Sequence, residues 1–146
     1  MESYNDEYFM LQALVEAQRA FERGEVPVGA VIVCKNRIIA RAHNLTETLT
    51  DTTAHAEMQA ITAAANARGG KYLNDCTLYV TIEPCVMCGA ALGWAHIGRI
   101  VYGAKDEKRG YSLFSPSVLH QKTEVVSGVK AAECADMMIR FFKSKR

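Results

Sequence analysis

The sequence predicts an α/β fold in which helices cover both faces of one sheet. Residues 28–34 form a short continuous apolar run, which is typical of a strand buried on both faces. Residues 77–82 alternate between apolar and polar side chains, as a strand does. Helical segments at 54–68 and 84–95 each separate one expected strand from the next. Elements that alternate in this order usually form a sheet with helices on both sides.

The first expected element is a helix that extends from residue 6 to Gly24. Asn5 or Ser3 can cap its N terminus, and acidic residues occupy its first turn. Apolar side chains recur along it at helical spacing, at Met10, Leu14, Ala17 and Phe21. This helix should therefore cover one face of the sheet.

A β-hairpin is expected next, with the strand 28–34, a turn at 35–37 and a second strand at 38–43. Asn44 follows the second strand directly. Its amide can both donate and accept hydrogen bonds, which suits a side chain that binds the polar edge of a ligand. From the residues alone, a loop or capping role is the favoured interpretation of Asn44.

A threonine-rich loop leads from the hairpin to an alanine-rich helix at 54–68, which two glycines end. Asp51 or Thr53 can cap this helix. His55 would then lie in its first turn.

The C-terminal half continues the alternation of strands and helices. Pro84 suits the first position of a helix, because its missing N–H would be unpaired there, so the helix 84–95 should begin at this residue. Strands are expected at 99–102 and 123–126, and a final helix at 131–142. Four large side chains of this helix should face the core or, as the less favoured alternative, a partner subunit: Met137, Met138, Phe141 and Phe142.

The composition fits one folded domain that spans residues 1–146. Of these residues 49% are apolar, which is enough for one substantial core. The sequence has no apolar run of about 18 residues, and it begins with an acidic segment instead of a basic and then apolar leader. We therefore expect a soluble, cytoplasmic protein with no membrane contact.

The chain has five cysteines, an odd number that cannot all pair within it. Cys34, Cys76 and Cys134 lie in apolar contexts or at the ends of elements, where buried free thiols are common, and we assign them no role. Cys85 and Cys88 differ, because two intervening residues are typical of metal ligands. On a helix, this spacing places both sulfurs on one face.

A zinc site with one open position is the simplest interpretation of these two cysteines. The positive end of the helix after Pro84 favours thiolates, which are the form that binds zinc. His55 is the candidate third ligand, and water would take the fourth tetrahedral position, whereas structural zinc sites usually close all four. Glu57 is the candidate general base, because residues at i and i+2 of a helix point apart and it should not share the metal with His55.

His-Ala-Glu at 55–57 together with Pro-Cys-Val-Met-Cys at 84–88 resembles the signature of the zinc-dependent cytidine and adenosine deaminases. Longer strings are similar to those of the tRNA-specific members of this family, at 25–30, 53–57, 83–88 and 97–104. The resemblance covers nearly the whole chain.

This resemblance implies a three-layer α-β-α cytidine-deaminase-like fold with a central five-stranded mixed sheet, and one Zn²⁺ per subunit. The implied reaction is hydrolytic deamination of adenosine to inosine at the wobble position of a tRNA anticodon loop, carried out by a homodimer. The residues that it implies are the metal ligands His55, Cys85 and Cys88, the catalytic Glu57, and the substrate contacts Val28, Asn44, Ala56 and Asp106.

The charge distribution is compatible with an RNA partner. Residues 1–98 hold 7 Lys and Arg against 11 Asp and Glu, a net charge of −4, whereas residues 99–146 hold 10 against 5, a net charge of +5. The irregular segment 103–121 interleaves basic and aromatic side chains, which can hold phosphates and stack unpaired bases. Solvated surface charges and ordinary packing aromatics are the alternative interpretation of these features.

The sequence departs from the family pattern at positions outside the catalytic and metal-binding residues. Residues 109–114 replace a glycine- and alanine-rich turn, Thr52 stands where proline is usual, and Gly89-Ala90 replaces the commoner Ala-Gly. A deaminase of a free base, nucleoside or nucleotide, such as guanine, cytosine or cytidine, is therefore the second hypothesis. The third is a binding module in which zinc is only structural, and Glu57 beside an open position argues against it.

Overall fold

The computed structural model describes residues 4–145, so the alternative cap Ser3 lies outside the described residues. Its elements in chain order are α1 (Asp6–Glu22), β1 (Gly29–Cys34), β2 (Arg37–His43), α2 (Ala56–Arg68), β3 (Cys76–Ile82), α3 (Val86–Trp94), β4 (Arg99–Ala104), a short 3-10 helix (Tyr111–Leu113), β5 (Glu124–Val126) and α4 (Ala131–Ser144). None of the helices within 4–145 combines the length and the apolar character that crossing a lipid bilayer requires.

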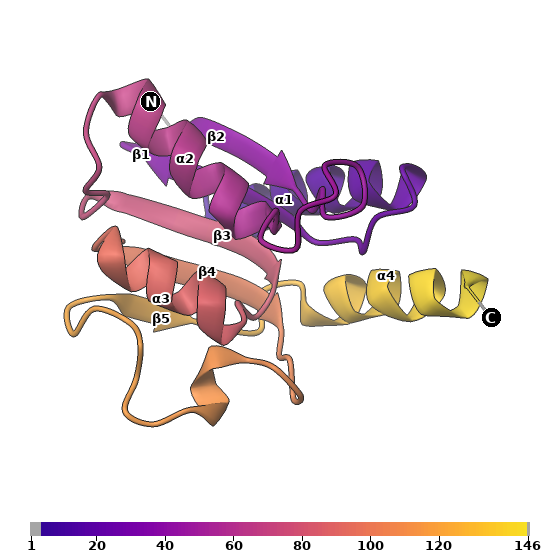
Figure 1. Ribbon diagram of the computed structural model, residues 1–146. Helices are drawn as coiled ribbons and strands as arrows, with labels where there is room; N and C mark the ends of the chain where they lie inside the picture. The colour runs from indigo at the N-terminus through magenta and orange to yellow at the C-terminus, as the bar shows by residue number, and fades with distance from the viewer. Residues whose placement is uncertain (1–3, 146) are drawn as a thin grey trace.

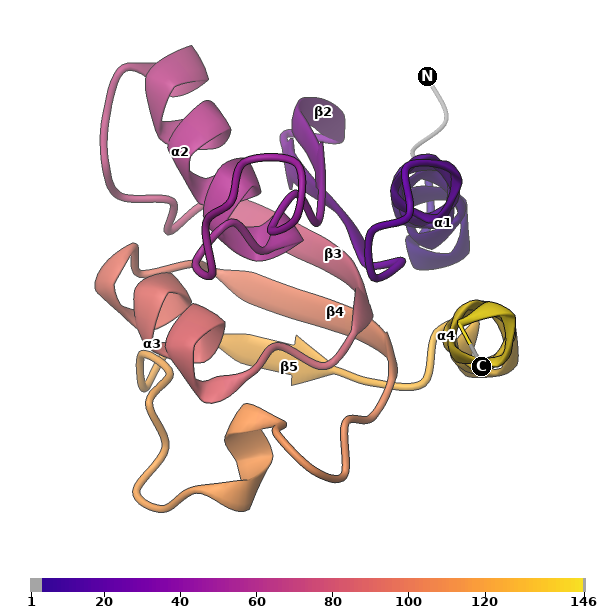
Figure 2. The same ribbon diagram turned by 45° about the vertical axis from the view of Figure 1, so that its right-hand side comes forward.

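The five strands form one mixed sheet in the order β2-β1-β3-β4-β5. β1 is antiparallel to both β2 and β3, whereas β3, β4 and β5 run parallel to one another. α1 and α4 lie on one face of this sheet, and α2 and α3 lie on the other (Figures 1 and 2). The predicted three-layer fold with a central five-stranded mixed sheet is confirmed.

The core is divided by the sheet into two clusters, because successive strand residues point to opposite faces. The cluster under α2 and α3 includes Ile32, Leu78, Ile100, Ala60 and Leu92. The cluster under α1 and α4 includes Val31, Tyr79, Val101, Met10 and Cys134. Both faces of β1, β3 and β4 are thus buried, which explains why 28–34 is apolar without alternation.

The α1 helix is capped as predicted and lies very close to β1. The Asn5 side chain accepts a hydrogen bond from the Tyr8 N–H, at 2.9 Å. At the start of β1, a Cβ on Gly29 would collide with backbone atoms of Ala13 and Ala17 in α1. Glycine at this position therefore allows the helix to pack directly on the strand.

The hairpin turn is tighter than the sequence predicted. Lys35 and Asn36 both have left-handed backbone conformations, with φ of 52° and 61°, and they form a two-residue turn. Such turns match the twist of the two strands that they connect. The second strand therefore begins at Arg37, one residue earlier than predicted.

The α2 helix begins at Ala56, two residues later than predicted. His55 has an extended backbone and is the N-cap residue, so its placement in the first turn was wrong. Asp51 does not cap the helix, because its Oδ1 accepts hydrogen bonds from the N–H and hydroxyl of Thr53 within the loop.

The α3 helix also begins later than predicted, at Val86, with Cys85 as its N-cap residue. Pro84 therefore precedes the helix and does not occupy its first position. The Pro84 carbonyl accepts a hydrogen bond from the Tyr111 N–H, and Cys85 forms an isolated β-bridge with Gly110. These contacts keep the backbone extended up to Cys85.

The α4 helix packs on β4 and continues beyond the ends of the strands (Figure 1). Met137 and Phe141 are buried, as the prediction of core packing required. The same prediction was wrong for Phe142, which is 48% exposed, and only half right for Met138, which is half-buried. Neighbouring helical residues point about 100° apart, so Met138 and Phe142 cannot lie on the same face of the helix as Met137 and Phe141.

Candidate active site

The predicted site residues meet at one edge of the sheet. β3 and β4 are parallel, so their carboxyl ends, at Ile82 and Ala104, lie at this edge. β1 starts there because it is antiparallel to β3, and β2 ends there because His43 pairs with Gly29. Carboxyl ends of strands are common positions for ligand sites in α/β folds.

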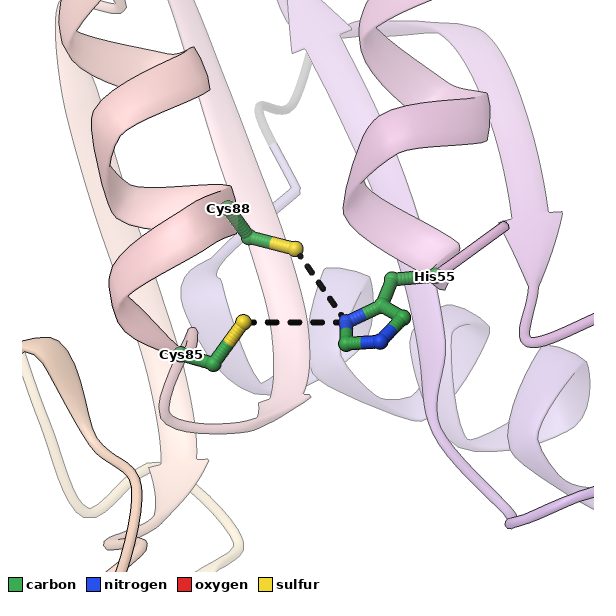
Figure 3. Close-up of side chains that lie close together, drawn as sticks. All are labelled: His55, Cys85 and Cys88. Atoms are coloured by element: carbon green, nitrogen blue, oxygen red, sulfur yellow. Dashed lines mark hydrogen bonds between the residues drawn. The ribbon is translucent and has the colours of Figure 1, made fainter. Parts of the chain in front are cut away.

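His55, Cys85 and Cys88 lie between the N-terminal ends of α2 and α3 (Figure 3). His55 Nδ1 is 3.7 Å from Cys85 Sγ and 3.4 Å from Cys88 Sγ, and the three donor atoms all lie within 4.8 Å of one another. In a tetrahedral zinc site with ordinary bond lengths, nitrogen and sulfur ligands are about 3.6 Å apart. The spacing of this trio therefore fits Zn²⁺.

The electrostatics of the two cysteines also favour a cation. A hydrogen bond with Cys88, and a further contribution from His55, lower the pKa of Cys85 to about 4. The hydrogen bond with Cys85 and burial raise the pKa of Cys88, and the hydrogen bond with Cys85 also raises the pKa of His55. Two adjacent sulfurs can both ionise only beside a positive charge, so this donor set suits a divalent metal ion.

A second cluster, of Cys34, Asp75 and Cys76, has donor atoms equally close together but different chemistry. The Arg68 guanidinium already occupies it, pairing with Asp75 and donating to Cys76 Sγ at 3.1 Å. Burial raises the pKa of Cys76 to about 12, which keeps the thiol protonated. A protonated thiol beside a guanidinium is a poor metal ligand, so the cluster does not resemble the first trio.

Glu57 lies beside the trio and is 4% exposed. Burial raises its pKa to about 7, because a poorly solvated site disfavours the charged carboxylate. His55 reaches the cysteines from the N-cap position, whereas Glu57 lines the pocket from the first turn of α2. A carboxyl group with a pKa near neutrality can both accept and donate a proton.

A cavity of about 410 Å³ opens beside Glu57 and the trio. This volume lies in the range of small-molecule sites. The four residues that the resemblance implied as substrate contacts all line it: Val28, Asn44, Ala56 and Asp106. His55, Glu57 and Cys85 line the same cavity, so two of the three predicted metal ligands face the same space as the predicted substrate residues, whereas Cys88 is fully buried.

Residues 3–104 match the model of the cytidine and deoxycytidylate deaminase zinc-binding region. The chain belongs to this deaminase family. A tRNA-specific adenosine deaminase of Agrobacterium fabrum is 46% identical, over 95% of this chain and 95% of the relative. One of Bacillus subtilis is also 46% identical, over 97% of this chain and 91% of the relative. The family is zinc-dependent, in agreement with the donor set described above.

A solved structure from a study of A-to-I editing by tRNA:A34 deaminases at the wobble position of transfer RNA is similar to this deaminase along most of its length. The two chains are 47% identical, with a TM-score of 0.84 over 89% of this chain and 98% of the other. The fold and the arrangement of elements are therefore those of a deaminase that has been solved experimentally.

Several residues that line the pocket of this deaminase were not predicted as site residues from the sequence: Val26, Thr46, Glu83, Met138 and Phe142. Arg109 also lines it and lies in the segment 103–121, whose basic and aromatic side chains were predicted to suit RNA. Glu25 was missed as well, although it contacts the pocket-lining Asn44, whose Nδ2 donates to Glu25 Oε1 at 3.5 Å and to Thr46 Oγ1 at 3.3 Å. The signal that could have identified Glu25 and Glu83 is that each is a glutamate in apolar surroundings, the first just before Val26 and the second just before Pro84. A carboxylate in apolar surroundings requires hydrogen-bond partners, so such a glutamate indicates a segment that is held by polar contacts.

Proposed function

We propose that this protein is a zinc-dependent hydrolase that deaminates adenosine to inosine at the wobble position of a tRNA anticodon. The main support is a base-sized cavity lined by Glu57, His55 and Cys85, with Cys88 completing the group of possible metal donors. The chain that carries this site is 46% identical over nearly its whole length to proteins named tRNA-specific adenosine deaminase.

His55, Cys85 and Cys88 would hold the zinc ion. When bound, zinc supplies a Lewis acid that lowers the pKa of a water molecule and so provides the nucleophile. Three protein ligands leave a position open, which is typical of catalytic zinc sites.

Glu57 is the proposed general base and acid. Its carboxylate takes one proton from the attacking water and passes it to the purine ring, then takes the proton of the hydroxyl group formed at the attacked carbon and passes it to the amino group, which leaves as ammonia. The burial that raises its pKa to about 7 supports both steps, because the proton is then neither too tightly nor too weakly held. The side chain faces the same cavity as His55 and Cys85.

Val28, Asn44, Ala56 and Asp106 are the proposed substrate contacts. Val28 and Ala56 provide apolar and small surfaces against which a flat base can pack, and the Asn44 amide can bond a base edge. Asp106 acts differently, because its Oδ1 accepts hydrogen bonds from the N–H groups of Lys108 and Arg109. It therefore shapes the loop at the pocket as well as lining the pocket.

The loop beyond Asp106 is the proposed contact for the anticodon backbone. Lys105, Lys108 and Arg109 are exposed, and Phe114 is also exposed. Arg109 lines both the base pocket and a neighbouring cavity that Phe114 also lines. Cations beside an exposed aromatic ring suit a single-stranded RNA segment whose base has been drawn into the site.

The substrate is tested by comparing an anticodon stem-loop that carries the wobble adenosine with free adenosine, guanine, cytosine and cytidine. We expect kcat/KM for the stem-loop to be at least about 100-fold higher, because remote contacts with RNA contribute to catalysis at the base. Faster turnover of any free base or nucleoside would favour the alternative enzyme. One zinc per chain with no deamination of any of these compounds would instead indicate a binding module.

We further propose that residues 1–146 form one deaminase domain that acts in the cytoplasm. The support for one domain is that the relatives align with at least 95% of this chain. The proposed tRNA substrate supports a cytoplasmic location. Limited proteolysis, which would release a stable fragment from a chain with two domains, and fractionation of cells test these two statements.

A homodimer is also proposed, with α3 as a contact between subunits. Trp94, in the last turn of α3, is 79% exposed, and with Ala90, Val118 and Leu119 it lines a shallow cavity. A large exposed aromatic side chain beside a cavity is a common anchor of protein interfaces. We expect Trp94→Arg to weaken the dimer by about 2 kcal/mol or more, which is about thirtyfold in Kd, as measured by sedimentation.

The matched control for this prediction is Leu11→Arg, which places the same charge at an exposed apolar residue of α1 on the opposite face of the sheet. This control should leave the dimer unchanged. Equal sedimentation of the Trp94 variant and the parent protein would contradict the proposed contact.

A further inference from the structure

Two buried carboxylates, Glu25 and Glu83, lie beside the base pocket without a cationic partner in residues 4–145. Glu25 is 0% exposed and Glu83 is 2% exposed. The hydrogen bonds that they accept come instead from two separate loops. Buried charges normally require a compensating charge or several hydrogen bonds, so these carboxylates need the loops that surround them.

Glu25 binds the loop that follows β2. Its Oε1 accepts from the Glu47 N–H at 3.1 Å, and its Oε2 accepts from both the N–H and the hydroxyl of Thr48 at 2.6 Å. Its Oε1 also accepts from Asn44 Nδ2, at 3.5 Å. Burial raises the pKa of Glu25, but these hydrogen bonds outweigh it and hold the pKa below its usual value. Because a carboxylate only accepts, the nitrogen of the Asn44 amide must face Glu25, which fixes the orientation of that amide.

Glu83 binds the loop that follows β4. Its Oε1 accepts from the Asp106 N–H at 3.2 Å, and its Oε2 accepts from the N–H of Ser112 at 3.1 Å and from its hydroxyl at 2.6 Å. The loop passes so close to the carboxylate that a Cβ on Gly110 would collide with it. Glu83 therefore sets the position of Asp106, which in turn orders the turn that carries Arg109.

The two loops lie on either side of β1 and β3, because β2 and β4 flank that pair in the strand order. Asn44 and Thr46 line the pocket from one side, and Asp106 and Arg109 line it from the other. We propose that Glu25 and Glu83 are positioning residues, each of which holds one wall of the base pocket in the geometry that the substrate requires. This proposal rests on the proposed function and adds two residues to it that do not perform the chemistry.

The test uses Glu25→Gln and Glu83→Gln in the full-length, zinc-loaded protein. Each substitution keeps the shape of the side chain but presents an amide N–H₂ to loop groups that are themselves donors, so the loop should shift. We expect KM for the anticodon stem-loop to rise and kcat/KM to fall by about 10- to 100-fold, which is the usual effect of a displaced binding group. Zinc content and the pH profile of kcat should remain those of the parent protein.

Glu16→Gln is the matched control. Glu16 is a carboxylate that is 3% exposed, accepts hydrogen bonds, and lies on α1 outside the pocket lining. Partial unfolding of any variant would lower kcat, through a smaller active fraction, and would leave KM unchanged. The proposal is overturned if KM in the Glu25 and Glu83 variants changes no more than in the Glu16 variant.

Hydrogen–deuterium exchange provides a second readout that does not depend on activity. Glu25→Gln should speed exchange in residues 44–48 alone, and Glu83→Gln should speed exchange in residues 106–112 alone. If the parent protein fails to deaminate the stem-loop, the proposed function fails, and the exchange measurement still decides whether the carboxylates hold the loops. Unchanged exchange in these segments would contradict the proposal.

Discussion

Glu57→Gln is expected to lower kcat by about 10²- to 10⁴-fold while the protein keeps its zinc, because the loss of a general base has effects of this size. Glutamine has nearly the same shape, so the buried site around the 4% exposed side chain should stay packed. What it lacks is a group that can take the proton from water. Turnover of the anticodon stem-loop and zinc per chain, measured on the same sample, give the result.

The pH dependence provides a second signature of the same residue. Burial raises the pKa of Glu57 to about 7, so the carboxyl group is neutral below this pH and ionised above it. Because a general base must be ionised, kcat/KM of the parent protein should rise with pH through about 7. In the Glu57→Gln variant, kcat/KM should no longer rise with pH in this range.

Glu22→Gln, at an exposed residue near the end of α1, is the control and should preserve both activity and the pH profile. Full turnover in the Glu57→Gln variant, with normal zinc content, would show that another residue is the base.

Cys88→Ala is expected to release most of the zinc and to lower turnover by at least about 10³-fold, because without the ion the pKa of water stays several units higher. The Cys88 sulfur is buried and lies 3.4 Å from His55 Nδ1, so the substitution removes one of the three donor atoms of the trio. The melting temperature should fall too, since metal binding contributes to the stability of the folded state. Metal analysis, activity and thermal unfolding are the three measurements.

Cys134→Ala is the matched control, because Cys134 is an equally buried free cysteine on the other face of the sheet. It should keep one zinc and its activity, at a cost of about 1 kcal/mol in stability. A Cys88→Ala variant that retains stoichiometric zinc and normal turnover would exclude this cysteine as a ligand.

The sequence predicted those parts of the site that depend on neighbouring residues. His55, Glu57, Cys85 and Cys88 fall into two short motifs, and each motif sits where a loop or strand passes into a helix, so local patterns were sufficient to find them. The exact helix starts were not predictable in the same way. Cys85 is kept out of α3 by its bridge with Gly110, a contact across 25 residues that no local pattern contains.

The walls of the pocket were the least predictable part for the same physical reason. Glu83 meets its partner Ser112 only after the chain has passed through α3 and β4, and Glu25 meets Thr48 across the whole hairpin. In α4, spacing could show that Phe141 and Phe142 face different directions, but not which face of the helix the sheet would cover. Tertiary packing determines both the partners of the two glutamates and the face of α4 that is buried.

The trio of His55, Cys85 and Cys88 also has a consequence for folding. His55 and Cys85 are 30 residues apart in the chain, so an ion held by both closes a loop that contains all of α2 and β3. A covalent cross-link that closes a loop of this length would reduce the entropy of the unfolded chain by an amount worth about 3–4 kcal/mol. The metal would therefore fasten α2 to α3 as a disulfide does, but in a form that a chelator can reverse.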